Sequence, residues 1–198
     1  MNTGSGVSRE TLIERHFPLR GSEISAYANF LATAGIERGL IGPREGERIW
    51  DRHIFNCLAL TTLIPEGAKV FDVGSGAGLP GIVIALARPD LQVTLIEPLQ
   101  RRVDFLIEAT QGLEIEVLRG RAQEIKLQAP VVVARALAPM DRMKRMLWHL
   151  VQPGGTLLAM KGENAAAELE MAPGGELHEI QLPDMELARV ISLSKRAK

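Results

Sequence analysis

A glycine-rich stretch, FDVGSGAGLPG at residues 71–81, holds the residues whose types and spacing are best suited to chemistry. Glycine adopts positive φ and lets a ligand approach the backbone, so glycines at alternate positions indicate a binding loop. The stretch follows an apolar run at 69–73 and precedes a helix-sized apolar segment at 79–87. Doubly wound sheets bind nucleotide-like ligands where a strand passes into a helix, and the loop therefore predicts such a ligand.

A carboxylate one strand further along strengthens this prediction. Glu97 directly follows VTLI at residues 93–96, a run rich in β-branched residues. At the carboxyl end of a second strand, a carboxylate can accept hydrogen bonds from the ribose hydroxyls of an adenosine moiety. The alternative for Glu97 is a surface acid without a ligand.

Two cofactors fit the glycines, depending on where the turn begins. The G-x-G-x-x-G pattern at 76–81 matches the dinucleotide fingerprint of NAD-dependent oxidoreductases. The frame that starts at Asp72 reads D-V-G-S-G-A-G and resembles motif I of class I S-adenosylmethionine-dependent methyltransferases. Because we expect the strand to end at Val73, the turn begins at Gly74, which favours the methyltransferase frame.

The rest of the sequence supplies the elements that must position this loop. Helical periodicity covers residues 22–64, and strand-like runs then alternate with helical segments. This order predicts an α/β, Rossmann-like, doubly wound and mostly parallel sheet. Two late strands without an intervening helix predict an antiparallel hairpin at one edge of the sheet, which gives the sheet an antiparallel C-terminal edge strand. We expect a flexible N-terminus at 1–21, an N-terminal helical cap at 22–66 and a methyltransferase domain at 67–198. The expected strands cover residues 69–73, 93–96, 115–118, 131–134, 156–160, 176–182 and 188–193.

Composition narrows the class of protein. The chain has 198 residues, of which 46% are apolar, yet it has no apolar run of membrane-spanning length. Its N-terminus lacks the regions of a signal peptide, and a single cysteine, Cys57, excludes a disulfide within the chain. The four histidines lack metal-ligand spacing, so we expect no metal site. We expect a cytoplasmic monomer that does not bind membranes.

Four motifs together resemble the bacterial 16S ribosomal RNA guanine-N7 methyltransferase family, also called glucose-inhibited division protein B. The similarity covers about residues 22–195. Two departures matter: GLIGPRE stands where many members have Asn-Leu-Thr, and Ala-Arg-Ala stands where many have Ser-Arg-Ala. The first departure leaves the RNA contacts open. The motifs are DVGSGAGLPGI at 72–82, DRHIFNCL at 51–58, ARA at 134–136 and KG at 161–162.

The resemblance implies transfer of a methyl group from S-adenosylmethionine to N7 of a guanosine in the 530 loop of 16S ribosomal RNA. Its implied partner is that RNA or the small ribosomal subunit. Guanine N7 is an acceptor with a free lone pair. It can attack the methyl group in line without a general base, so the chemistry depends mainly on positioning.

The resemblance also implies roles for individual residues on the cofactor side. The glycine loop would approach the methionine moiety, and Glu97 would bind the ribose. Asp72 would orient the loop or the cofactor's amino group, unless it only caps the turn. The implied cofactor-binding residues are Asp72, Gly74, Gly76, Gly78, Leu79, Glu97, Ala122, Gln123 and Arg135, with Ala122 and Gln123 next to adenine.

On the substrate side, Arg135 follows an apolar run and needs a polar partner. That partner would be the target guanine, an RNA phosphate or the cofactor's carboxylate, or alternatively Glu97 or Asp72 in an ion pair. The resemblance makes Arg135 the positioning residue of the reaction. It makes Arg52, His53 and Lys161 RNA contacts, although His53 on a helix could simply be packed and Lys161 could be solvated.

Three other functions are compatible with the residues alone. A methyltransferase could act on a small molecule or a protein, because a net charge of −1 and 4% aromatic residues do not single out RNA. The glycines at 76–81 could instead bind NAD in an oxidoreductase. A non-catalytic module would bind the cofactor and transfer nothing.

Overall fold

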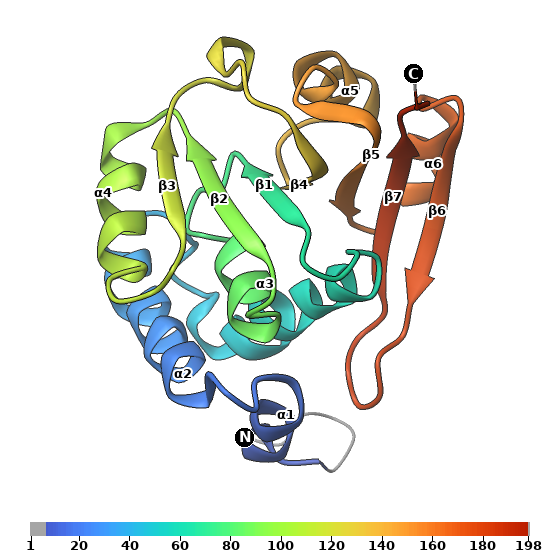
Figure 1. Cartoon of the computed structure of the whole chain (residues 1–198). Coiled ribbons are helices and arrows are strands. Elements are labelled where there is room, and N and C mark those ends of the chain that lie inside the picture. Colours follow the sequence, from blue (N-terminus) through green and yellow to red (C-terminus); the bar gives the residue numbers. More distant parts are fainter. Residues whose placement is uncertain (1–6, 198) are drawn as a thin grey trace.

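A seven-stranded sheet forms the centre of the computed structural model, which describes residues 7–197 (Figure 1). Its strand order is β3-β2-β1-β4-β5-β7-β6. Strands β1 to β5 run parallel to one another, and β7 runs antiparallel to both β5 and β6. The strands are β1 (Lys69–Val73), β2 (Gln92–Glu97), β3 (Glu116–Arg119), β4 (Ala129–Arg135), β5 (Val151–Lys161), β6 (Gly175–Ile180) and β7 (Ala188–Ser194).

Helices cover both faces of this sheet. One face packs against α2, α3, α4 and the turns at 46–62, and the other packs against α5. The α-helices are α1 (Arg9–His16), α2 (Gly21–Phe30), α3 (Gly81–Ala87), α4 (Gln100–Ala109), α5 (Met140–Leu147) and α6 (Ala165–Glu170). Helix α2 continues as a π-helical turn at Leu31–Gly35, and short turns follow at Gly46–Arg48, Ile49–Phe55, Leu58–Thr62 and Ala122–Glu124.

Strand β1 shows how the sequence divides between the two faces. Val70 belongs to the core under the N-terminal helices, whereas Phe71 and Val73 belong to the core under α5. Successive side chains of a strand point to opposite faces, so Asp72 lies on the same face as Val70, toward α3. The predicted strand 69–73 coincides with β1, and the predicted α/β, mostly parallel sheet is confirmed.

The C-terminal strands β6 and β7 form the predicted antiparallel hairpin at one edge of the sheet, and β6 is its outer strand. The antiparallel strand β7 does not lie at the edge, because β6 pairs on its outer side. Val190 and Ile191 of β7 are fully buried, while β6 carries the polar residues Glu176 and Glu179. Charged side chains are typical of edge strands, and β6 therefore takes the edge.

The N-terminal prediction needs correction. Residues 1–6 of the expected flexible stretch lie outside the described residues, but Arg9–His16 forms helix α1. The Ser8 hydroxyl accepts a hydrogen bond from the Thr11 backbone N–H at 3.2 Å, and Leu12 is buried. A short helix with one buried side chain has little apolar periodicity, which is why the pattern does not predict it.

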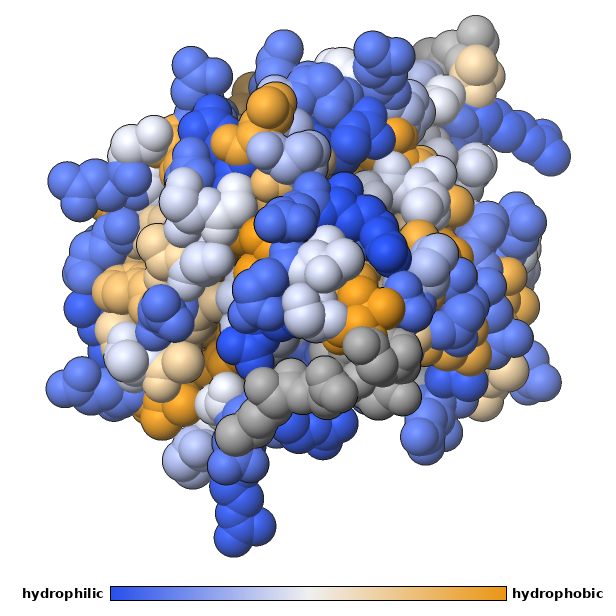
Figure 2. All heavy atoms as spheres, turned by 90° about the horizontal axis from the view of Figure 1, so that it is seen from below, coloured by the Kyte–Doolittle hydropathy of each residue, from blue (hydrophilic) through white to orange (hydrophobic). Residues whose placement is uncertain are grey.

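The underside of the molecule in Figure 1, on which α1 lies, is mostly hydrophilic. Figure 2 shows this face, with hydrophobic colour confined to small areas between polar side chains. Over residues 7–197, no helix is long and apolar enough to cross a membrane.

Candidate functional site

The loop after β1 turns through backbone conformations that favour glycine. The φ angles of Gly74, Gly76 and Gly78 are +74°, +59° and +97°. A Cβ on Gly78 would lie 2.4 Å from Cδ1 of Ile82, so that side of the loop is closely packed. The nearest neighbour that a Cβ on Gly76 would meet is the Gly74 carbonyl oxygen, at 3.8 Å, so the backbone there is open to a ligand.

Asp72 anchors the other end of this loop. Its side chain is fully buried, and Oδ2 accepts a hydrogen bond from the Gly81 backbone N–H, at the start of α3, at 3.0 Å. Among the described residues, Oδ1 has no hydrogen-bond partner. Burial raises the pKa of Asp72 to about 7, although the bonds from Gly81 and Ser75 and the charge of Arg135 oppose that rise. Asp72 therefore holds the loop and also offers a buried acceptor.

Glu97 fastens the loop to the second strand. Its side chain is 1% exposed, which excludes the alternative of a surface acid. Oε2 accepts from the Gly76 N–H and Oε1 from the Leu99 N–H, both at 3.0 Å. The Arg102 guanidinium lies 3.7 Å from Oε2. Each carboxylate oxygen keeps a second lone pair that a hydroxyl group can use.

A largely apolar cavity of about 240 Å³ lies beside these residues. Gly74 lies on one side of it, and Ala122 and Gln123, which follow β3, lie on another. The predicted adenine residues and the loop thus share one cavity, whereas Leu79 is packed into the core under the N-terminal helices. The cavity is lined by Val73, Gly74, Ile96, Pro98, Gly120, Arg121, Ala122, Gln123, Leu137 and Met146.

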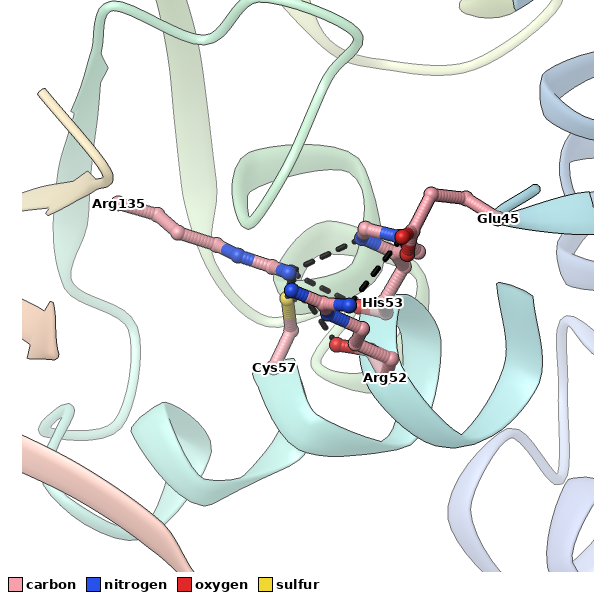
Figure 3. A network of polar contacts seen from close by, with 5 residues as sticks. All are labelled: Glu45, Arg52, His53, Cys57 and Arg135. Carbon is pink, nitrogen blue, oxygen red and sulfur yellow. Dashed lines mark hydrogen bonds and ion pairs between the residues drawn. The ribbon is translucent and has the colours of Figure 1, made fainter. Parts of the chain in front are cut away.

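Arg135, at the end of β4, reaches toward the helical turn Ile49–Phe55 and not toward the carboxylates. Figure 3 shows its guanidinium pointing at His53 and Cys57. Nη2 donates to the Arg52 carbonyl at 3.2 Å and lies 3.0 Å from His53 Nδ1. Nη1 donates to the His53 carbonyl and to Cys57 Sγ, both at 3.3 Å. Within residues 7–197 it forms no ion pair with Glu97 or Asp72, so that alternative was wrong.

His53 lies between Arg135 and Glu45 (Figure 3). Its Nε2 is 2.8 Å from Glu45 Oε2, and it is only 9% exposed. Glu45 also accepts from the Arg52 guanidinium through Oε1 at 3.2 Å. Burial lowers the pKa of His53 below its ordinary value, and the hydrogen bond to Glu45 opposes that change. The same hydrogen bond lowers the pKa of Glu45.

Lys161, at the end of β5, is not a solvated lysine. Its Nζ lies 2.6 Å from Glu168 Oε2 and donates to the Ala138 carbonyl at 2.8 Å. Glu168 Oε2 also accepts from the Met140 backbone N–H at 3.1 Å. The lysine therefore holds the loop after β4 in place.

A second cavity, of about 610 Å³, lies between β4, β5 and the turns at 46–55. It contains more basic than acidic side chains, which suits an anionic ligand. Its basic lining residues are Arg48, Arg52, Arg135, Lys161 and Arg189, and its acidic ones are Glu163, Glu168 and Glu186.

The loop at 136–139 joins the two cavities. Leu137 lines both of them. Ala136 has a φ of +52°, a conformation that costs a non-glycine residue about 1–2 kcal/mol.

Among the described residues, no group of three or more His, Cys, Asp or Glu side chains could hold a metal ion. The apolar cavity can hold an apolar ring on one side of the 136–139 loop, and the basic cavity can hold an anionic group on the other side.

Sequence reasoning missed several residues that build this site. Glu45 and Glu168 belong to no recognised motif. Glu45 binds His53, and Glu168 of α6 binds Lys161 of β5. Tyr27 of α2 is buried and donates through its hydroxyl to the Ala77 carbonyl at 2.9 Å. The apolar periodicity of α2 could indicate burial of Tyr27, but no signal pointed to its partner.

Comparison with known proteins places the chain near one family. The family described as rRNA small subunit methyltransferase G matches residues 20–186. The chain is 52% identical over 176 residues to ribosomal RNA small subunit methyltransferase G of Acidothermus cellulolyticus, covering 87% of this chain and 78% of that protein. It is 56% identical over 155 residues to the Salinispora arenicola protein of the same name, covering 72% of this chain and 64% of that protein.

Solved structures resemble the chain in fold. A SAM-dependent methyltransferase from Aquifex aeolicus superposes with a TM-score of 0.57 at 17% identity, over 81% of this chain and 97% of that one. A T. thermophilus 16S rRNA N2 methyltransferase in complex with AdoMet and guanosine gives a TM-score of 0.56 at 15% identity, over 74% of this chain and 43% of that one. At these identities the likeness shows the class I methyltransferase fold.

Proposed function

The chain belongs to the rRNA small subunit methyltransferase G family and so is an S-adenosylmethionine-dependent rRNA methyltransferase, and we propose that it methylates N7 of a guanosine in the 530 loop of 16S ribosomal RNA. The observation that carries this proposal is the pairing of two cavities across the 136–139 loop. One is apolar and lies beside the glycine loop, and the other is rich in arginine. The family membership sets aside the NAD-dependent oxidoreductase.

The residues in and beside the apolar cavity fit the cofactor. Gly76 leaves its backbone open, and Asp72 Oδ1 is a buried acceptor for an ammonium group. Glu97 has lone pairs for ribose hydroxyls, and Ala122 and Gln123 line the space for adenine. When bound there, S-adenosylmethionine supplies a methyl group on a positively charged sulfur.

The basic cavity suits an RNA segment. Arg52 is exposed and lines it, and Arg135 reaches its edge from β4. A guanidinium can donate to guanine O6 or to a phosphate, and either contact would leave N7 free. Since N7 already carries a lone pair, this chain needs no general base. Its residues contribute by orienting the target, for which effective molarities correspond to about 7–11 kcal/mol. Lys161 contributes by holding the 136–139 loop through Ala138.

Transfer of labelled methyl groups tests the proposal. The enzyme receives labelled S-adenosylmethionine with small-subunit ribosomal RNA, either naked or in 30S particles that lack the modification. We expect 7-methylguanosine after nuclease digestion, located in the 530 loop, from at least one substrate. Glu97→Ala should lower the label through weaker cofactor binding. Tight cofactor binding without label on either substrate would overturn the RNA assignment, and label on another atom would overturn N7.

A further inference from the structure

The hydrogen bonds of His53 determine which ring nitrogen carries its proton. A guanidinium has only donor groups, so the 3.0 Å contact between Arg135 Nη2 and His53 Nδ1 requires an unprotonated Nδ1. The proton then lies on Nε2, which donates to Glu45 Oε2 at 2.8 Å. A carboxylate that binds one ring nitrogen in this way sets the role of the other. His53 is therefore neutral, with its proton facing Glu45.

This arrangement joins two distant parts of the chain. Arg135 lies 82 residues from His53, and its other contacts are carbonyls of the same helical turn and Cys57 Sγ. A free arginine side chain has about 2 kcal/mol of rotamer entropy. Holding the guanidinium at four atoms of the N-terminal segment removes much of that freedom before substrate binds.

We propose that Glu45 is a positioning residue that fixes the His53 tautomer, so that His53 Nδ1 holds Arg135 at the carboxyl edge of the sheet. Glu45 lines neither cavity and acts through His53. The inference rests on the proposed function, because Arg135 is a reaction-side residue only there. It also changes the expected role of His53 from RNA contact to support of Arg135.

The charged groups around this unit explain why His53 must stay neutral. Glu45, which precedes Gly46, faces His53. Arg52 lies next to His53 in the turn Ile49–Phe55, and Arg135 reaches His53 from β4. Cys57 faces Arg135, and the charge of Arg135 also acts on Asp72. Protonation of His53 would add a proton at Nδ1, opposite the Nη2 donor, and would place a third positive charge beside two arginines.

The resulting dependence on pH has a defined sign. Burial lowers the pKa of His53 below 6.5, and Glu45 opposes that change. Methyl transfer should therefore fall as the pH drops through the lowered pKa, because Arg135 then loses its acceptor. Replacing Glu45 by a neutral group removes the opposing effect and should move this acidic limb to lower pH.

The first test compares the pH profiles of kcat for wild type, Glu45→Gln and Glu47→Gln. Glu47 is an exposed carboxylate two residues away and serves as the matched control. We expect Glu45→Gln to lower kcat about 10-fold at neutral pH, to leave the KM for S-adenosylmethionine unchanged and to shift the acidic limb downward. Glu47→Gln should match the wild type. A lower kcat without a moved limb would show a folding defect only and would overturn the inference.

The second test separates the two partners of Glu45, since its Oε1 also binds Arg52. Asparagine at position 53 presents a carbonyl near the place of Nδ1 but cannot reach Glu45. We expect His53→Asn to lose the acidic limb of the pH profile. In the His53→Asn background, Glu45→Gln should have no further effect on kcat. A second loss of kcat in the double variant would show that Glu45 acts through Arg52.

A third measurement does not depend on rRNA activity. The ¹⁵N chemical shifts of His53 in the full-length protein report its tautomer directly. We expect the Nε2–H form in the wild type and a mixture in Glu45→Ala. An Nδ1–H form in the wild type overturns the inference whatever the activity. Failure to methylate rRNA overturns the proposed function. The tautomer of His53 still shows, in that case, whether Glu45 fixes the ring nitrogen that contacts Arg135.

Discussion

The apolar cavity beside Gly74 and the basic cavity beside Arg135 share the 136–139 loop but are built from different groups. Around the first, the buried carboxylates Asp72 and Glu97 accept hydrogen bonds from backbone N–H groups of the glycine loop, of the start of α3 and of Leu99. Around the second, arginine and lysine side chains bond to side chains and carbonyls of other segments, as Arg135 does with His53 and Lys161 does with Glu168 and Ala138. The first cavity is formed within one part of the sheet, and the second needs the N-terminal turns to be docked.

This difference predicts two kinds of sensitivity. A backbone-built site fails when a side chain is added, because its space is already filled. A site built from side chains fails when one partner is removed or changes its charge, because a buried donor or acceptor is then left unpaired. Variants of each cavity can therefore show whether the two divide in this way.

The largest expected effect is the loss of cofactor binding in Gly78→Ala. The new Cβ would lie 2.4 Å from Ile82 Cδ1 and 3.2 Å from the Tyr27 hydroxyl, at a φ of +97°. Overpacking costs about 1–3 kcal/mol, and positive φ adds about 1–2 kcal/mol. We expect a loss of binding of at least about 100-fold by calorimetry, together with a lower free energy of unfolding in urea.

Gly112→Ala is the matched control for this prediction. Gly112 has a φ of +79°, but a Cβ there would have no neighbour within 4 Å. It should lower the free energy of unfolding by about 1 kcal/mol through backbone strain alone and leave cofactor binding intact. Equal behaviour of the two variants would show that close packing is not what shapes the loop.

Arg135→Ala should have the next largest effect, on turnover only. It removes the guanidinium that we propose orients the target, but it leaves the glycine loop and Glu97 in place. We expect methyl transfer to fall about 100-fold, because a poorly oriented target loses about that factor, while cofactor binding changes little. Arg142→Ala, which removes an exposed arginine of α5, is the control. Parallel loss of cofactor binding in Arg135→Ala would contradict the division between the cavities.

The same division decides how much could be predicted from the sequence. The glycine frame, the end of β1 at Val73 and the place of Glu97 at the end of β2 follow from local patterns, and the structure brings the loop and Glu97 together. Apolar periodicity reports burial and turns, so the α/β sheet was predictable as well. The partners of Arg135 and Lys161 were not, because no periodicity records which polar side chains meet across 82 residues or between β5 and α6. The inner place of β7 depends on such pairing too.

On the cofactor side, Asp72 should make the free energy of unfolding depend on pH. The pKa of Asp72 is raised to about 7 in the folded protein, against 3.8 when exposed. The folded state therefore binds the proton more tightly, and this stabilisation is full below about pH 4 and is lost as the pH rises toward about 7. Between about pH 5 and pH 8, the wild type should lose about 2–3 kcal/mol more of its free energy of unfolding than Asp72→Asn does. Equal slopes in urea titrations would show that Asp72 is ionised throughout.

The smallest effect is expected at the loop that the two cavities share. Ala136 has a φ of +52°, which glycine adopts without strain. Relief of about 1–2 kcal/mol should outweigh the extra unfolded-state entropy of glycine, so Ala136→Gly should raise the free energy of unfolding by about 0.5 kcal/mol. Ala138→Gly, whose residue lacks positive φ, should lower it by a similar amount. Because Arg135 and Leu137 flank Ala136, the looser backbone should also reduce methyl transfer by about 2-fold without changing cofactor affinity. A stability change of the same sign in both variants, measured in urea, would show that Ala136 is unstrained and that the shared loop owes its shape to Lys161 and its other contacts alone.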